Sequence, residues 1–247
     1  MPNDALKKMP VCLVIGAGDA TGSAIAKRFA REGFVACLVR RGGEKLAPLV
    51  KEIETAGGRA SGYGCDARKE EEMIALVDRI EAEVGPIEVA VFNVGANVRF
   101  GILEMTTRVY TKVWEMAALG GFHTGREAAR VMLPRGKGTI LFTGATASMR
   151  GGAGYAAFAG AKFALRALAQ SMARELGPKG IHVAHLVIDG AIDTDFIRTQ
   201  FPERYAMKKD GGILAPASIA EAYWQIHRQS RDAWCHEMDL RPWVEAW

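Results

Sequence analysis

The sequence predicts an α/β fold, a single doubly wound domain whose mostly parallel seven-stranded sheet has helices on both faces. Short, continuously apolar runs alternate along the chain with amphipathic stretches. Such runs are typical of parallel strands buried on both faces and joined by right-handed helical crossovers. No repeat, low-complexity linker or break in composition divides the 247 residues, so residues 1–247 are expected to form one domain.

The first half of the chain alternates strand and helix three times. The predicted strands are VCLVIG (11–16), FVACLVR (34–40) and the weaker RASGYGCD (59–66). The predicted helices are SAIAKRFAREG (23–33), EKLAPLVKEIETAGG (44–58) and KEEEMIALVDRIEAEVG (69–85). Each helix has apolar residues at helical spacing and ends at glycine, a residue that commonly terminates helices.

The second half continues the same alternation. Strands are predicted at 87–95, 139–144, 181–190 and around 234–240, and helices at 107–133, 154–177 and 217–229. Pro134 sets the end of the long helical region at 107–133. Residues 191–215 contain Gly211 and Gly212 and have no regular periodicity, so they are predicted to form a mobile segment on the substrate side of the domain.

Composition excludes several classes of function. The net charge of +4 is small, and lysines and arginines are dispersed among acids, so no nucleic-acid partner is expected. No apolar run approaches the roughly 20 residues that span a bilayer, and the amino terminus does not resemble a secretory signal. A small-molecule substrate, rather than a membrane or a nucleic acid, is therefore predicted.

The cysteines and histidines indicate neither disulfides nor a metal. Four cysteines are far apart and form no CxxC pair, and Cys12 and Cys37 lie in predicted strands. Buried free thiols in a reducing, cytoplasmic location are the expected state. His182 and His185 lie three apart in a strand and so face opposite sides, which makes them poor joint ligands, and no metal site is predicted.

A glycine-containing loop, GAGDATGSAIA (16–26), follows the first strand and opens the first helix. Glycines there let the backbone approach a pyrophosphate, which the helix amino terminus stabilises. Matched to G-x-x-x-G-x-G, the loop keeps Gly16 and Gly22 but has Ala20 at the middle glycine. Asp19 would repel a diphosphate unless it caps the helix instead. A plain turn is the alternative, but the strand–loop–helix context favours cofactor binding by Gly16, Asp19, Ala20, Thr21 and Gly22.

Two arginines end the second strand. Arg40 and Arg41 lie about 20 residues beyond the glycine loop, where an acid would bind the ribose 2′-hydroxyl of NAD. A guanidinium there offers a planar fork to a 2′-phosphate instead. Solvated surface arginines are the alternative interpretation, but the position predicts NADP(H) in preference to NAD(H).

Nearly the whole chain resembles the short-chain dehydrogenase/reductase family, in the glycine loop and in three further motifs. This resemblance implies a Rossmann fold. CDARKEEE (65–72) is similar to the family's third-strand segment, which implies that Asp66 contacts adenine with Ala67 beside it. FNVGAN (92–97) stands where the family has N-N-A-G, with Asn93 and Gly95 matching. The motifs occur in the family's order and at its intervals.

A fourth motif, IDGAIDT (188–194), resembles the family's P-G-x-V-x-T. Gly190 and Thr194 match, Ile192 is a near match, and Asp189 replaces the proline. The resemblance implies that the Ile192 backbone and the Thr194 hydroxyl hold the nicotinamide carboxamide. The helices at 107–133 and 154–177 are rich in small residues, as interface helices in this family are, so a homo-oligomer is expected, a tetramer in preference to a dimer.

The family's usual catalytic set is Asn, Ser, Tyr and Lys. Carried over by position, these fall near Ala117 and on Ala145, Phe158 and Lys162, so only the lysine is retained. Methyl and phenyl groups have no proton to give. One hypothesis is therefore a non-catalytic dinucleotide-binding protein, a sensor or scaffold that has lost the chemistry.

Another spacing favours an enzyme. Tyr155 and Lys162 resemble the Y-x6-K arrangement of the divergent branch that includes enoyl-acyl-carrier-protein reductases. On a helix, positions 155, 158 and 162 share one face. We therefore predict a catalytic pair, Tyr155 and Lys162, that serves hydride transfer between nicotinamide and a carbonyl or enoyl substrate. Thr146 or Ser148 could supply the hydroxyl missing at Ala145, and simple packing of Tyr155 is the alternative.

Overall fold

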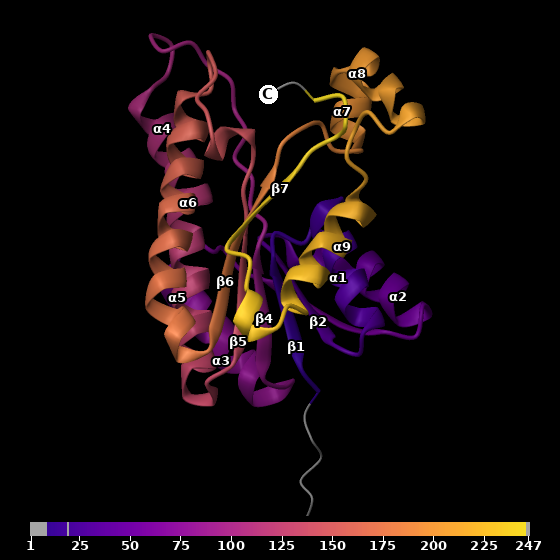
Figure 1. Cartoon of the computed structure of the whole chain (residues 1–247), viewed down its shortest axis with the longest axis vertical. Helices are drawn as coiled ribbons and strands as arrows, with labels where there is room; N and C mark the ends of the chain where they lie inside the picture. Colours follow the sequence, from indigo (N-terminus) through magenta and orange to yellow (C-terminus); the bar gives the residue numbers. More distant parts are fainter. Residues whose placement is uncertain (1–8, 19, 246–247) are drawn as a thin grey trace, which may run out of the picture.

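A computed structural model describes residues 9–18 and 20–245 of the chain (Figure 1). In these residues, seven strands form one sheet in the order β3-β2-β1-β4-β5-β6-β7, and every neighbouring pair is parallel. The strands are β1 (Val11–Ile15), β2 (Val35–Arg40), β3 (Arg59–Gly64), β4 (Ile87–Phe92), β5 (Gly138–Thr143), β6 (Ile181–Ile188) and β7 (Glu237–Leu240). The predicted doubly wound α/β fold is confirmed.

Helices cover both faces of the sheet (Figure 1). One layer contains α3 (Glu70–Glu83), α4 (Thr107–Trp114), α5 (Gly120–Met132) and α6 (Ala156–Leu176). The opposite layer contains α1 (Thr21–Arg31), α2 (Ala47–Thr55) and α9 (Pro216–His227). Within the described ranges, no helix combines the length and the apolar character that crossing a bilayer requires.

The period-two pattern of the strands explains the two layers. In β1, Leu13 and Ile15 pack into the core under α3, α5 and α6, whereas Cys12 and Val14 pack into the core under α1, α2 and α9. All five residues of this strand are buried. Each fully buried Leu, Ile or Val contributes about 1.5–3 kcal/mol through removal of apolar surface from water, so the central strands anchor the fold.

The helical region predicted at 107–133 is present without a break from Thr107 to Met132. A wide turn at Glu115–Leu119, with hydrogen bonds of π-helical type, joins α4 to α5. Ala117 in this turn is fully buried, and a Cβ added at Gly121 would lie 2.3 Å from Leu165 Cδ1 of α6. The small residues thus allow both helices to lie close to α6. The predicted helical region is confirmed, and only its wide π-helical turn was not predicted, because helical periodicity carries no signal for an extra residue in a turn.

The predicted mobile segment at 191–215 contains two short helices, α7 (Asp195–Gln200) and α8 (Pro202–Ala206). Its two ends are joined, since Ile192 pairs with Leu214 and the Leu214 N–H donates to Ala191 O at 2.8 Å. The segment stands beyond the carboxyl end of β6, apart from both helical layers (Figure 1). Its mobility stays a prediction.

Candidate active site

Two adjoining cavities lie along the carboxyl ends of the strands. One, of about 600 Å³, lies beyond β1, β2 and β3, and the other, of about 510 Å³, lies beyond β4, β5 and β6. Both are lined by Asn93, Val94 and Gly95, the turn that follows β4. The strand order reverses between β1 and β4, and ligands of open α/β sheets bind at such a switch point.

The glycine loop folds directly onto this turn. Gly16 has a φ of +88°, and a Cβ there would lie 2.5 Å from Asn93 O. A Cβ at Gly22 would lie 2.3 Å from Gly16 O, and the Asn93 side chain donates to the same carbonyl at 3.1 Å. Both positions therefore require glycine, and α1 begins at Thr21. The predicted Asp19 lies outside the described residues.

The larger cavity collects the residues predicted for the adenosine end. Arg40, Arg41, Asp66 and Ala67 all line it. The Asp66 carboxylate accepts hydrogen bonds from Arg68 Nε at 2.9 and 3.1 Å and a further contact from its Nη2. These hydrogen bonds hold the pKa of the Asp66 carboxyl below its ordinary value. Any contact of Asp66 with an adenine would therefore be made beside Arg68.

The smaller cavity collects the residues predicted for the reacting end. Tyr155, Phe158 and Lys162 line it, so the two members of the predicted catalytic pair share one cavity. Tyr155 is the residue immediately before α6, because Gly154 has a φ of +84° and a helix cannot continue through it. The expectation that Tyr155 lies inside the helix was therefore wrong, although Tyr155 lines the same cavity as Lys162.

Lys162 is a buried ammonium. Its side chain is 2% exposed, and Nζ donates to Thr143 O at 2.8 Å and to Val94 O at 3.2 Å. Among the described residues, no carboxylate lies within ion-pair distance of it. Burial lowers the pKa of Lys162 to about 8. An ammonium has three N–H groups, so one remains for a ligand in the cavity.

The two hydroxyls that could replace the one missing at Ala145, those of Thr146 and Ser148, form hydrogen bonds with other groups of the protein. Thr146 lines the cavity, but its hydroxyl donates to Asp189 Oδ1 at 2.5 Å. Ser148 is fully buried, accepts from the Ala145 N–H at 3.1 Å and does not line the cavity. Neither residue presents a proton to a ligand in this structure, so the expected substitution was wrong.

The other predicted residues divide between lining and supporting positions. Thr21, Gly190 and Ile192 line the smaller cavity, whereas Ala20, Gly22 and Thr194 line neither. Thr194 caps α7, where its hydroxyl accepts from the Ile197 N–H at 3.2 Å. Its predicted contact with a carboxamide stays a prediction.

Sequence reasoning missed one polar network beside the cavity. The Asp189 carboxylate is fully buried and lies 3.3–3.4 Å from the guanidinium of Arg150, which lines the cavity. Arg241 contacts the same carboxylate at 3.4 Å. An acid in place of the family's proline was visible in the sequence, but its partners lie 39 and 52 positions away.

No metal centre is evident in the part of the chain that the structure describes, where no group of three or more His, Cys, Asp or Glu is placed to hold an ion. His182 stacks on Trp234, with ring centroids 4.7 Å apart. His185 lies 3.0 Å from a Glu237 oxygen. Both histidines thus have structural contacts.

The model of the short chain dehydrogenase family matches residues 10–204. The chain belongs to this family. The short-chain reductase protein NovJ of Streptomyces niveus is 32% identical over 225 residues, which cover 90% of this chain and 83% of NovJ. A 2-dehydro-3-deoxy-D-gluconate 5-dehydrogenase of Formosa agariphila is 31% identical over 86% of this chain and 85% of its own length.

A solved short-chain dehydrogenase from Rhodopseudomonas palustris is more similar. It is 54% identical, covers 95% of this chain and 99% of its own, and superposes with a TM-score of 0.82. The resemblance inferred from the motifs is thereby confirmed. Short-chain dehydrogenases are oxidoreductases that use a nicotinamide dinucleotide. That Ala145 and Phe158 occupy the positions of the usual serine and tyrosine stays a prediction.

The buried ammonium of this short-chain dehydrogenase predicts a pH-dependent stability. Below about pH 8, Lys162 is charged in both the native and the unfolded state, and the desolvation cost is fully present. As the pH rises from about 8 toward the ordinary value of 10.5, the native state loses its proton first and the cost falls. We expect the Tm of Lys162→Met, relative to wild type, to be highest at pH 7 and to decline by pH 10.

Thermal unfolding of the cofactor-free protein at the two pH values measures this difference. Lys51→Met, at an exposed position of α2, is the matched control and should show the same offset at both. A Tm difference for Lys162→Met that is identical at pH 7 and pH 10 would contradict the prediction.

Proposed function

We propose that the chain is an NADP(H)-dependent reductase that acts on a carbonyl or enoyl substrate. The observation that carries the proposal is that Tyr155 and Lys162 line one cavity, joined through the Asn93–Gly95 turn to a second cavity lined by Arg40 and Arg41. The glycine positions fit a dinucleotide, because side chains at Gly16 and Gly22 would collide with backbone atoms, and their absence leaves the loop backbone accessible.

The proposed chemistry assigns a role to each residue of the pair. When bound, the nicotinamide supplies or accepts the hydride. The Tyr155 hydroxyl donates a hydrogen bond, and then its proton, to the substrate oxygen on which negative charge develops. Lys162 holds a positive charge in the same cavity, where it stabilises the phenolate left on Tyr155, and its remaining N–H is available to a ribose hydroxyl.

A second candidate function is that of a non-catalytic dinucleotide-binding protein. It is favoured by Ala145, Phe158 and Ala117 at the family's catalytic positions, and by the Thr146 hydroxyl, whose proton goes to Asp189. Fluorescence titration with NADPH, followed by a turnover screen over aldehydes, ketones and enoyl thioesters, separates the two. Turnover supports the reductase, and tight binding without turnover supports the second candidate. A cofactor-bound crystal structure would show where the Tyr155 hydroxyl points.

The preference for NADP(H) is proposed from the basic end of the larger cavity. Arg40, Arg41 and Lys45 line it, so three cationic side chains surround the region beyond β2. Arginine binds phosphate through two parallel N–H groups, an arrangement that a ribose hydroxyl cannot match in strength.

We expect NADPH to bind more tightly than NADH, and Arg40→Ala to remove most of the difference. A charge-assisted hydrogen bond contributes about 1.5–3 kcal/mol, so the NADPH affinity should fall about tenfold or more. Fluorescence titration of both cofactors measures the effect, with the NADH affinity of the variant as its internal control. Equal affinities for the two cofactors in the unmutated protein would defeat the assignment.

If Tyr155 is the proton donor, Tyr155→Phe should leave NADPH binding nearly unchanged and reduce turnover by about 10²-fold or more. Lys162→Ala should damage both binding and turnover, because its ammonium serves the ribose as well as the tyrosine. Phe158→Tyr restores the commoner spacing but should not raise turnover, since Phe158 is 9% exposed and shapes a cavity already served by Tyr155. Normal turnover in Tyr155→Phe would remove Tyr155 from the mechanism.

We also propose a homo-oligomer, a tetramer in preference to a dimer. The outer faces of the helices α4, α5 and α6 carry large aromatic side chains that are 41–46% exposed, namely Tyr110, Trp114, Phe122 and Phe163. These helices form one layer of the molecule (Figure 1), and a second copy of this chain would cover the aromatics. Light scattering at micromolar concentration should report an oligomer, and Phe122→Glu should lower the mass. A wild-type monomer would reject the proposal.

The cytoplasm is the proposed location. The support comes from the cysteines, which are all free, with Cys12, Cys37 and Cys65 buried in the core. Free thiols persist in reducing compartments. Cell fractionation tests the assignment, and recovery of the protein in an oxidising compartment would contradict it.

A further inference from the structure

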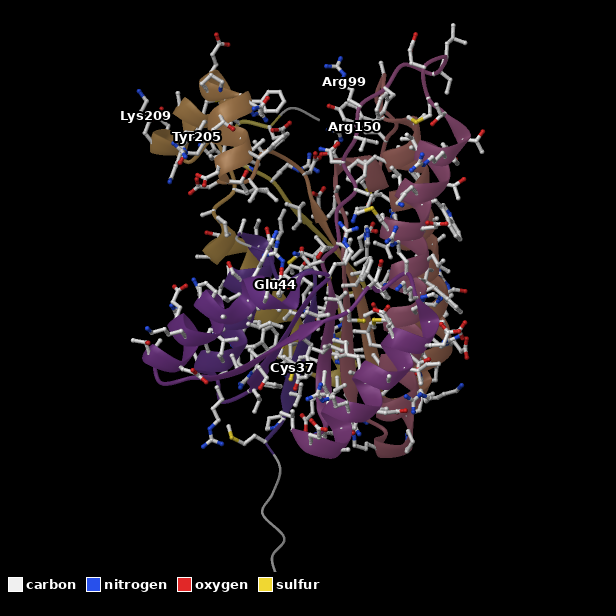
Figure 2. All side chains as sticks on the ribbon, turned by 180° about the vertical axis from the view of Figure 1, so that it is seen from behind. Cys37, Glu44, Arg99, Arg150, Tyr205 and Lys209 are labelled. Atoms are coloured by element: carbon white, nitrogen blue, oxygen red, sulfur yellow. The ribbon has the colours of Figure 1, made fainter. Side chains whose placement is uncertain are left out.

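Two arginines from separate loops lie beside the smaller cavity, and the proposed chemistry uses neither. Arg150 follows the Thr146–Ser148 turn and lines the cavity. Arg99 lies between β4 and α4, and its guanidinium carbon is 5.9 Å from the centroid of the Tyr155 ring. Figure 2 shows both side chains at the end of the molecule that also carries α7 and α8.

The backbone holds Arg99 near Tyr155. The Phe100 N–H donates to Gly154 O at 2.9 Å, which ties the Arg99 loop to the segment before α6. A Cβ at Gly154 would lie 3.0 Å from Arg99 Cγ, so glycine leaves the space that the arginine side chain occupies. Arg99 is exposed, and in the described ranges no carboxylate forms an ion pair with it. Arg99 does not itself line the cavity, but its guanidinium lies over the ring of Tyr155, which does.

Asp189 orients the Arg150 side chain but does not occupy all of its N–H donors. Its side chain is 44% exposed, and its two contacts to the carboxylate are long, at 3.3 and 3.4 Å. The same carboxylate has the shorter bond from Thr146 at 2.5 Å and a contact from Arg241. Since a guanidinium has five N–H donors, Arg150 retains donors for a ligand.

The charges that face the cavity are positive. Of the described residues that line it, Arg150 and Lys162 are cationic, and none is an aspartate or glutamate. The carboxylate that contacts Arg150, that of Asp189, is 1% exposed, and Asp189 does not line the cavity. The pyrophosphate of a dinucleotide would lie at the glycine loop, so it does not account for cations at this end.

We propose that the substrate carries an oxyanion group, a carboxylate or a phosphate, which Arg150 and Arg99 bind while the reacting carbon lies at Tyr155. The planar fork of a guanidinium matches both groups through paired N–H···O bonds. The inference rests on the proposed function, since it names the substrate class of the same site.

Isothermal titration of the full chain saturated with NADP⁺, which has no hydride to give, tests the inference without turnover. Benzoate and phenyl phosphate represent the two oxyanions, and benzamide is the neutral match. We expect at least one oxyanion to bind about tenfold or more tightly than benzamide. Arg150→Gln and Arg99→Gln should each weaken that oxyanion about tenfold and leave benzamide unchanged. The oxyanion that binds more tightly identifies the substrate group.

Arg31→Gln, at the exposed end of α1, removes the same charge far from the cavity and should change nothing. Equal affinities for benzamide and both oxyanions, or oxyanion affinities unaffected by both cavity variants, would overturn the inference. Two further titrations distinguish a failure of this inference from a failure of the proposed function. NADP⁺ is first titrated into the cofactor-free protein, and the oxyanion titrations are then repeated without NADP⁺. Failure to bind NADP⁺ counts against the proposed function, whereas NADP⁺ binding without oxyanion discrimination counts against this inference alone.

Discussion

The close approach of Gly16 to Asn93 is the constraint on which the site depends. The strands β1 and β4 are parallel neighbours, and Ile15 at the end of β1 lies opposite Phe92 at the end of β4. The loop after β1 therefore meets the turn after β4, and only glycine fits where their backbones touch. The helices that leave these two strands cover opposite faces, so the chain opens at this point. Both cavities are lined by the Asn93–Gly95 turn because they are the two sides of that opening.

The buried charge of Lys162 lowers the stability of the fold, because the ammonium is removed from water. A buried ammonium is normally paired with a carboxylate, but here two carbonyls, Thr143 O and Val94 O, provide its hydrogen bonds. Thr143 is the last residue of β5, and Val94 lies in the turn that follows the neighbouring strand β4, so the carboxyl end of the sheet positions the charge. A methionine would avoid the desolvation of a charge but would leave both carbonyls without their donor. A buried ammonium without a carboxylate partner beside a cavity supports the proposed role of Lys162.

The fold could be predicted from the sequence because it depends on the periodicity of apolar residues. Only part of the site could be predicted, because the site depends on contacts between residues far apart in the chain. Apolar runs predicted β1, β2, β4, β5 and β6, and the weaker segments at 59–66 and 234–240 contain β3 and β7. Arg40 ends β2 as predicted and lines the larger cavity. The wide turn at 115–119 and the start of α6 after Tyr155 depend on packing and on one left-handed glycine. The pairing of Arg150 with Asp189 joins residues 39 positions apart, and no local pattern encodes it.

Two residues that depart from the motifs expected of the family, Ala145 and Asp189, both adjoin Thr146. Ala145 offers no hydroxyl to the cavity, and the Asp189 carboxylate accepts a hydrogen bond from the hydroxyl of Thr146. Of the described residues that line the cavity, Tyr155 is the only tyrosine, and Lys162 lines the same space. Since stabilisation of a developing oxyanion requires preorganised donors, a reductase built on this cavity must place that demand on Tyr155 and on the field of the nearby cations. Asp189, buried at the end of β6, therefore acts on the cavity through Thr146 and Arg150, which line it.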